Sequence, residues 1–290
     1  MPELPDLLHI RKYLSNMIEG KTITGVTVKQ TVVLRVAVDQ RFDQAMSNRI
    51  IEAVAIHGPF LRFDLSDSID IVTNLMLSGR LQHQRGPEKV DGHLCCSWHL
   101  DDGSRLNLCD ENKMAKVYVV QHGSYEAIPK YREQGIDIRS LQFTLQAFKE
   151  LARKHSRKQV RVFINDHTIL SSVGNAYADE ILFDARIHPK TFVSRLKEEE
   201  ISRLYASIVS VIEWGTQKVE EAAKPIQVKV RDHMKVRNRK GEPCPRCGTT
   251  IRREGVRGHD VFFCPRCQPA SRHLFIDWNK TETDIKAASP

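Results

Sequence analysis

Short runs in which apolar and polar positions alternate dominate the N-terminal part of the chain, between residues 22 and 122. These runs are rich in β-branched residues and read ITGVTVKQ, RIIEAVAI, LRFDLS, DIVTNLML, LCCSWHL and AKVYVV. Turn-forming sequences such as HGP, SDS, RGPEK and DDGS separate them. The pattern predicts a β-sandwich or barrel of about seven or eight strands. A helix predicted over residues 4–18 has Leu7, Ile10 and Leu14 on one face and should pack beside it.

After Phe143 the apolar period lengthens to that of a helix. Helical patterns cover TLQAFKELARKH, KQVRVFIN, NAYADEILFDARI and LKEEEISRLYASIVSVIEWGTQKVEEA, with a loop around SSVG. At 290 residues the chain is long for one domain. We therefore expect a multidomain α+β protein. Its parts are a β-sandwich catalytic domain over 1–125, a helical domain over 126–224, a basic linker and zinc finger over 225–275, and a tail over 276–290.

Positive charge is concentrated near the C-terminus. Residues 224–272 hold thirteen Lys and Arg against four Asp and Glu, a charge of +9, whereas the whole chain carries +8. This excess indicates a phosphate backbone as partner, and we expect the protein to bind DNA. A solvated basic surface and a membrane-facing patch are the alternatives.

Other features of composition limit where the protein works. No apolar run approaches the ~18 residues of a membrane span, and the N-terminus lacks the basic and apolar regions of a signal peptide. We therefore expect no membrane association. The prediction is a monomer in the reducing cytoplasm, associated with the nucleoid when bound to DNA.

Four of the seven cysteines have the spacing of a metal site. They form two C-x2-C pairs separated by sixteen residues: Cys244, Cys247, Cys264 and Cys267. This spacing predicts one structural Zn²⁺ held by four thiolates. Two disulfides or a redox pair are the alternatives, and both suit a reducing compartment poorly. We expect Cys95, Cys96 and Cys109 to be buried apolar residues instead.

The first residues, MPELPD, raise a separate question. Pro5 and Asp6 suit the first turn of a helix, where a fixed φ and a negative charge are both favourable. Helix formation gives no reason for Pro2 and Glu3.

Three motifs together resemble one family. MPELPD is similar to the MPELPE start of the formamidopyrimidine-DNA glycosylase and endonuclease VIII family. VGNAYADEILFDARIHP resembles its helix-two-turn-helix signature, and GEPCPRCGTTI with FFCPRCQ resembles its C-terminal zinc finger. SGRL at 78–81 also matches, and the resemblance covers about residues 2–270. It implies a DNA N-glycosylase and AP lyase of base excision repair.

The resemblance gives Pro2 and Glu3 a role. It implies that Met1 is removed and that the Pro2 amine attacks C1′ of the damaged nucleotide, forming a Schiff base before elimination nicks the strand. The chemistry is reasonable, because a terminal amine has a pKa of about 8 against about 10.4 for lysine, so more of it is unprotonated. Glu3 is then placed to transfer protons.

The resemblance also implies DNA contacts. Asn175, which follows Gly174 at a helix start, corresponds to an asparagine that binds phosphate near the lesion; a helix N-cap is the alternative. Leu77 stands where the family has a methionine that fills the space left by the flipped nucleotide. In the finger, His259 takes the place of the family's phosphate-binding arginine, with Arg257 two residues before it.

Several positions depart from the family pattern. Pro59 replaces a lysine that assists excision, and Arg62 and Lys113 are the candidate replacement cations. Asn112 stands where an arginine faces the orphaned base, and Met114 replaces a phenylalanine wedge. We therefore expect a lesion preference different from that of an 8-oxoguanine enzyme. A family member that binds damaged or abasic DNA without excision is the first alternative. A zinc-ribbon regulatory DNA-binding protein is the second.

Overall fold

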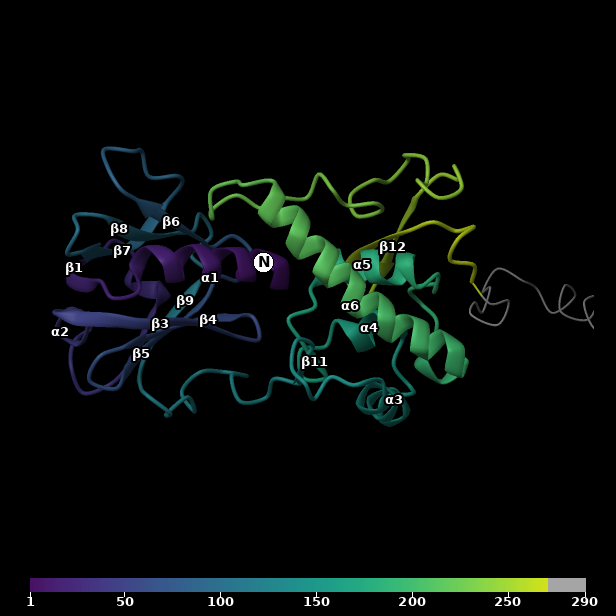
Figure 1. Ribbon diagram of the computed structural model, residues 1–290, viewed down its shortest axis with the longest axis horizontal. Coiled ribbons are helices and arrows are strands. Elements are labelled where there is room, and N and C mark those ends of the chain that lie inside the picture. Colours follow the sequence, from purple (N-terminus) through teal and green to yellow (C-terminus); the bar gives the residue numbers. More distant parts are fainter. Residues whose placement is uncertain (271–290) are drawn as a thin grey trace, which may run out of the picture.

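The computed structural model describes residues 1–270, which form a β-rich body and a helical body with a small β-hairpin against the latter (Figure 1). The predicted fold class is confirmed: a β-sandwich with a flanking helix, a helical domain and a C-terminal finger. The domain boundaries remain predictions. Residues 271–275 of the expected finger segment and the expected tail over 276–290 lie outside the described residues. Within residues 1–270, no helix has the length and apolar character needed to cross a membrane.

Nine strands build the β-rich body, in the order β2-β9-β5-β4-β3-β1-β7-β8-β6. All neighbours pair antiparallel except β2 and β9, which are parallel. The strands are β1 (Thr22–Val28), β2 (Leu34–Ala37), β3 (Arg49–His57), β4 (Phe60–Leu65), β5 (Ile69–Asn74), β6 (Arg80–Gln84), β7 (Leu94–Leu100), β8 (Arg105–Cys109) and β9 (Lys116–Gln121).

The sheet folds over into two layers where β1 meets β3. These strands pair at Thr22 with Ile50 and at Ile23 with Arg49, after which β1 continues beside β7. Ile23 and Trp98 are buried in one apolar core shared by both layers. Burial of that interior drives this part of the fold.

The sequence pattern did not predict β2, β6 and β8. Strand β6 reads RLQHQ, and its polar residues Gln82 and Gln84 are nonetheless buried. Hydrogen bonds explain this: Asn107 Nδ2 donates to Gln84 Oε1 at 3.0 Å, Ser97 Oγ donates to Asn107 Oδ1 at 2.7 Å, and Asp91 N donates to Gln82 Oε1 at 2.9 Å. Buried polar groups that pair with one another leave no apolar alternation in the sequence.

The predicted helices are confirmed, and a short helix, α2, was not predicted. The helices are α1 (Leu4–Ile18), α2 (Phe42–Met46), α3 (Leu145–Lys154), α4 (Val160–Ile164), α5 (Asn175–Asp184) and α6 (Glu198–Glu221). Two 3-10 turns, η1 (Thr31–Val33) and η2 (Val193–Arg195), and a short parallel pair, β10 (Ile136–Asp137) with β11 (Leu170–Ser171), complete the two bodies.

Helix α1 connects the two bodies. Leu7, Ile10 and Leu14 belong to the sandwich core, whereas Leu4 belongs to the core of the helical body. The helix also contacts α6. Its first turn, and with it the N-terminus, therefore lies at the junction between the bodies (Figure 1).

The finger packs on α5. Its hairpin consists of β12 (Arg252–Val256) and β13 (His259–Phe263). Phe183 of α5 is buried in one cluster with Val236, Ile251 and Phe262. Glu180 of α5 accepts hydrogen bonds from the backbone N–H groups of residues 235, 236 and 237 at 2.9 to 3.0 Å. The basic linker is thus fixed to the same helix.

Candidate active site

Glu3 joins the N-terminus of the chain to α5. Its carboxylate is buried and accepts hydrogen bonds from Ala176 N at 2.9 Å and Tyr177 N at 3.0 Å. These are unpaired donors of the first turn of α5, where the helix dipole also favours a negative charge. A Cβ at Gly174 would lie 2.3 Å from Glu3 Cδ, so this close approach requires glycine.

The environment of Glu3 changes its acidity. Burial raises the pKa of the Glu3 carboxyl, although the two backbone hydrogen bonds and the Arg231 guanidinium oppose that shift. A carboxyl with a raised pKa can hold and release a proton nearer neutral pH. Glu3 is therefore suited to proton transfer beside Pro2.

A partly buried ion pair fixes the backbone next to Glu3. Glu3 N donates to Asp6 Oδ2 at 2.8 Å. The Arg231 guanidinium binds both oxygens of Asp6, with Nη1 to Oδ1 at 2.8 Å and Nη2 to Oδ2 at 2.6 Å. Such bidentate pairs restrict geometry strongly. The first turn of α1 is thus held to the segment that follows α6.

Pro2 is buried, and the terminal amine lies beside the turn after β5. The Met1 amine donates to Leu77 O at 3.3 Å, and Lys229 Nζ donates to the same oxygen at 3.0 Å. Burial, followed by the Lys229 charge, lowers the pKa of the Met1 amine from 8.0 to about 6. The site therefore favours an unprotonated amine at the start of the chain.

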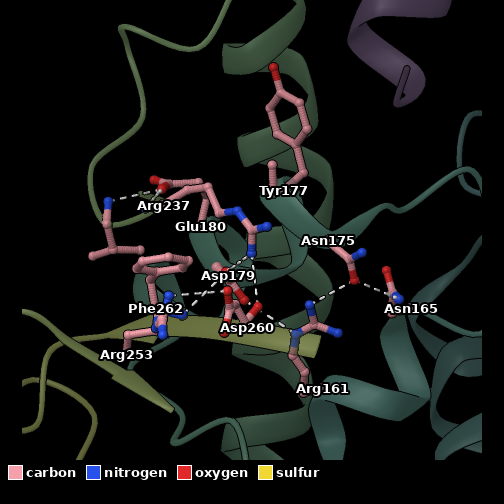
Figure 2. A network of polar contacts seen from close by, with 12 residues as sticks. Arg161, Asn165, Asn175, Tyr177, Asp179, Glu180, Arg237, Arg253, Asp260 and Phe262 are labelled. Atoms are coloured by element: carbon pink, nitrogen blue, oxygen red, sulfur yellow. Dashed lines mark hydrogen bonds and ion pairs between the residues drawn. The ribbon is translucent and has the colours of Figure 1, made fainter. Parts of the chain in front are cut away.

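Asn175 is the first residue of α5, and its side chain does not cap the helix. Gly174 is the N-cap, and Glu3 accepts the hydrogen bonds that a capping side chain would accept, so the alternative role for Asn175 is wrong. Asn175 Oδ1 instead accepts from Arg161 Nη2 at 2.8 Å and from Asn165 Nδ2 at 3.2 Å (Figure 2). With its oxygen so occupied, the Asn175 amide can offer its Nδ2 donor to a ligand.

The contact at Asn175 continues to the finger through a buried network (Figure 2). Arg161 Nε donates to Asp179 Oδ1 at 3.2 Å, and Arg237 Nη1 donates to Asp179 Oδ2 at 2.7 Å. The backbone N–H of Phe262, in β13, also donates to Asp179 Oδ2, at 3.3 Å. Two arginines offset the cost of burying the Asp179 charge. The orientation of Asn175 is therefore coupled to the position of the finger.

Two loops carry the predicted apolar wedges. Leu77 is 61% exposed and Met114 is 37% exposed. The loops are tied together at Asp110, which accepts from Ser78 Oγ, from Asn112 N at 3.1 Å and from Ala115 N at 2.7 Å. Asn112 Nδ2 also donates to Ser78 Oγ at 3.0 Å. Lys113 follows with a φ of +54°, and the structure thus joins the three loop residues to the turn that carries Leu77.

The remaining predicted residues lie on other elements. Arg257 and His259 are exposed at the tip of the finger hairpin, separate from the buried N-terminal site. Pro59 lies in the turn between β3 and β4. Arg62 pairs with Asp64, with Nε to Oδ1 at 2.6 Å and Nη2 to Oδ2 at 3.0 Å, so it is already engaged.

The four predicted zinc ligands converge. All their Sγ atoms lie within 4.8 Å of one another, with 3.9 Å between Cys244 and Cys267 and 3.5 Å between Cys247 and Cys264. Tetrahedral coordination with Zn–S of about 2.3 Å requires separations of about 3.8 Å, so the cluster fits Zn²⁺. The prediction of one structural zinc is confirmed. Cys95, Cys96 and Cys109 are free and buried in the sandwich, as predicted.

Sequence reasoning missed Arg161, Asp179, Arg231 and Lys229. Arg161 lies inside the apolar helix VRVFI, and a charged residue there indicates a buried ion pair. Its partner could not be read from the sequence, because Asp179 lies on a different helix. Lys229 resembles any other lysine of the basic segment until its position beside the terminus is known.

Comparison with known proteins agrees with this arrangement. The chain matches the models of the formamidopyrimidine-DNA glycosylase N-terminal domain at residues 1–117, of the corresponding H2TH domain at 135–226, and of the zinc finger found in FPG and IleRS at 241–270. Formamidopyrimidine-DNA glycosylase of Cytobacillus firmus is 32% identical over 278 residues, which are 92% of this chain and all of the relative. The protein of that name from Pelotomaculum thermopropionicum is 30% identical over 275 residues, 92% of this chain and 99% of the relative.

Solved structures show the same fold. The Lactococcus lactis Fpg in complex with abasic-site DNA superposes with a TM-score of 0.83 at 22% identity, covering 93% of this chain and 100% of that chain. MutM (Fpg) from Thermus thermophilus superposes with a TM-score of 0.78 at 28% identity and the same coverage. The sequence matches extend over the sandwich, the helical domain and the finger, and this chain belongs to the formamidopyrimidine-DNA glycosylase family of DNA repair enzymes.

Proposed function

We propose that this chain is a damaged-base DNA glycosylase with AP lyase activity, whose nucleophile is the Pro2 amine of a chain that has lost Met1. The observation that supports it best is the contact of Glu3 with the first turn of α5. That contact supports a site in which the Pro2–Glu3 pair and Asn175 act together, at the junction of the two bodies.

The proposed reaction follows from these groups. The Pro2 nitrogen uses its lone pair to form a bond to C1′, while the base leaves with the electron pair of the broken glycosidic bond and takes up a proton. The nitrogen loses its own proton, Glu3 protonates the departing ring oxygen, and an iminium forms at C1′. Removal of a C2′ proton then expels the 3′ phosphate. A secondary amine yields an iminium that is cationic without protonation, which favours this elimination.

The proposed partner is damaged duplex DNA, or DNA with an abasic site, bound by a monomer in the cytoplasm. The target nucleotide must leave the base stack to reach Pro2. Leu77 and Met114 are exposed apolar side chains on joined loops, which suits filling of the vacated space.

The polar residues of the proposed site serve the DNA backbone and the opposite strand. Asn175 Nδ2, Arg257 and His259 are donors for phosphates. Asn112 and Lys113, on the loop that is joined to the turn of Leu77, are assigned to the strand opposite the lesion.

The test is borohydride trapping on an abasic-site duplex, with mass spectrometry to prove the absence of Met1. We expect an adduct that maps to Pro2. The matched control is the same chain with an N-terminal extension, in which the Pro2 nitrogen is an amide and cannot attack. If the chain without Met1 forms no adduct yet binds the duplex, the proposal is overturned in favour of a binding-only family member. Equal binding to undamaged DNA would instead favour a regulatory zinc-ribbon protein.

The lesion preference is the second part of the proposal. Proline at 59 supplies neither a charge nor an N–H donor, and loss of one charge-stabilising contact typically costs about 10²–10³ in rate. An abasic site has no base to expel. We therefore expect the loss of rate to affect base excision and to leave the lyase step largely unchanged. The unmodified protein should trap abasic DNA strongly and excise oxidised purines weakly.

Substitution at this position tests the preference. Pro59→Lys should raise excision of an oxidised purine more than it raises lyase activity, measured on matched duplexes in single-turnover assays. Pro87→Lys, in the loop after β6, is a control for the added charge. Efficient 8-oxoguanine removal by the unmodified protein would contradict this part of the proposal while leaving the lyase intact.

A further inference from the structure

Lys229 places a second amine at the start of the chain. It lies in the segment that follows α6, and its Nζ donates to Leu77 O at 3.0 Å. The Met1 amine donates to the same oxygen at 3.3 Å, and Pro2, whose nitrogen becomes the terminal amine once Met1 is lost, lines one small cavity together with Lys229. Because both nitrogens contact one atom, the ammonium of Lys229 stands within the range at which charges change one another's protonation.

The other charged groups around the terminus are largely compensated. Asp6 is bound by Arg231 through two hydrogen bonds, and Glu3 is bound by the backbone at the start of α5. Arg80, on β6, pairs with Glu111. Within residues 1–270, no carboxylate lies within ion-pair distance of Lys229 Nζ. Its positive charge is therefore not cancelled by a direct partner.

We propose that Lys229 is a positioning residue for catalysis, which keeps the nucleophilic terminal amine unprotonated by placing a fixed positive charge beside it. This inference rests on the proposed function of Pro2. The physical reason is the order in which the two amines take up protons. An ordinary lysine has a pKa of about 10.4 and a terminal amine one of about 8, so Lys229 is protonated first and then disfavours a second charge nearby.

The surroundings act on the Lys229 ammonium as well. Burial lowers its pKa, and the charges of Arg231 and Arg80 lower it further, whereas Asp6 and the contact with the terminus oppose the shift in part. Although the residue as a whole is exposed, its amine end turns toward Leu77 O and the chain start. The charge is thus placed where solvent screens it less than on an open surface.

The experiment is the pH profile of single-turnover trapping on abasic DNA, at saturating DNA, with preparations proven to lack Met1. Lys229→Met should move the midpoint of the pH profile upward by about one pH unit. At pH values below the midpoints of both the unmodified protein and the variant, the variant should then react about tenfold more slowly. Lys229→Arg keeps the charge, and its midpoint should stay within a few tenths of a unit of the unmodified protein. Lys29→Met, at the exposed position just after β1, removes the same charge elsewhere and should change nothing.

Three other results would contradict the inference, each for a different reason. An unchanged midpoint in Lys229→Met means that the charge does not act on the amine. Loss of the adduct in both Lys229→Met and Lys229→Arg, with circular dichroism unchanged, means that Lys229 is itself the nucleophile. Absence of an adduct in the unmodified protein instead refutes the proposed function, before Lys229 is tested at all.

Discussion

Glu3 combines a structural task with a proposed chemical one. Its carboxylate accepts the N–H groups that begin α5, and the same carboxylate stands next to Pro2 in the chain. The approach is so close that residue 174 has no room for a Cβ. The backbone of Gly174 has a φ of −98°, which any residue can adopt, so the requirement for glycine there is purely steric.

Gly174→Ala tests this contact. The new Cβ must displace the Glu3 carboxyl, because the ideal Cβ position lies 2.3 Å from Glu3 Cδ. Overpacking of this kind typically costs about 1–3 kcal/mol of folding free energy. We expect a lower melting temperature together with a lyase rate reduced at least tenfold. Gly86→Ala is the control, since no atom lies within 4 Å of a Cβ there. Unchanged lyase activity in Gly174→Ala would show that the position of Glu3 is not critical.

Helix α5 holds together the buried polar part of the site. Its first turn binds Glu3, Asp179 binds Arg161 and Arg237, and Glu180 binds the linker backbone. Its last turn contributes Phe183 to the core of the finger. A ten-residue helix with buried acidic residues gains little from propensity alone. Its stability comes from these partners, which reach it from four separate segments.

Prediction from sequence succeeded where the signal was local. The periodic pattern located α5, and the cysteine spacing located the zinc ligands. The catalytic roles of Pro2 and Glu3, taken from the MPELPD start, stay predictions. It failed for β6, whose buried glutamines are satisfied through hydrogen bonds rather than through apolar contact. It also failed for the pairing of Arg161 with Asp179, because long-range pairs leave no periodic trace.

Removal of zinc should weaken DNA binding through the contact between the finger and α5. The thiolate cluster supplies the folding energy of the finger, which has a small core of its own. Chelation should unfold the hairpin, remove Phe262 N from Asp179 and weaken binding to abasic-site DNA at least tenfold, with the sandwich still folded. Metal analysis, circular dichroism and an affinity measurement check this together. Cys109→Ala, which removes a buried thiol outside the cluster, should retain one zinc. Undiminished DNA affinity after complete zinc release would contradict the coupling.

At the scale of the whole molecule, the N-terminus lies between the two bodies, and the basic segment begins at the end of α6 (Figure 1). The segment is bound by Glu180 of α5 before it reaches the finger, and it supplies Arg231 and Lys229 beside the terminus and Arg257 at the hairpin tip. We therefore expect a DNA substrate that engages both the finger and the terminal amine to lie along this positive segment.

The salt dependence of DNA affinity measures how many phosphates this positive segment contacts. Each neutralised phosphate of duplex DNA contributes about −0.9 to the slope of log K against log salt, and about four to eight contacts would give a slope of about −4 to −7. Arg257→Gln should make the slope less steep by about one, because an exposed arginine at the hairpin tip is free to bind one phosphate. Lys29→Gln, outside the basic segment, should leave the slope unchanged. A slope near zero would mean that the positive segment does not follow the DNA backbone, and the path from terminus to finger would then have to be abandoned as the binding surface.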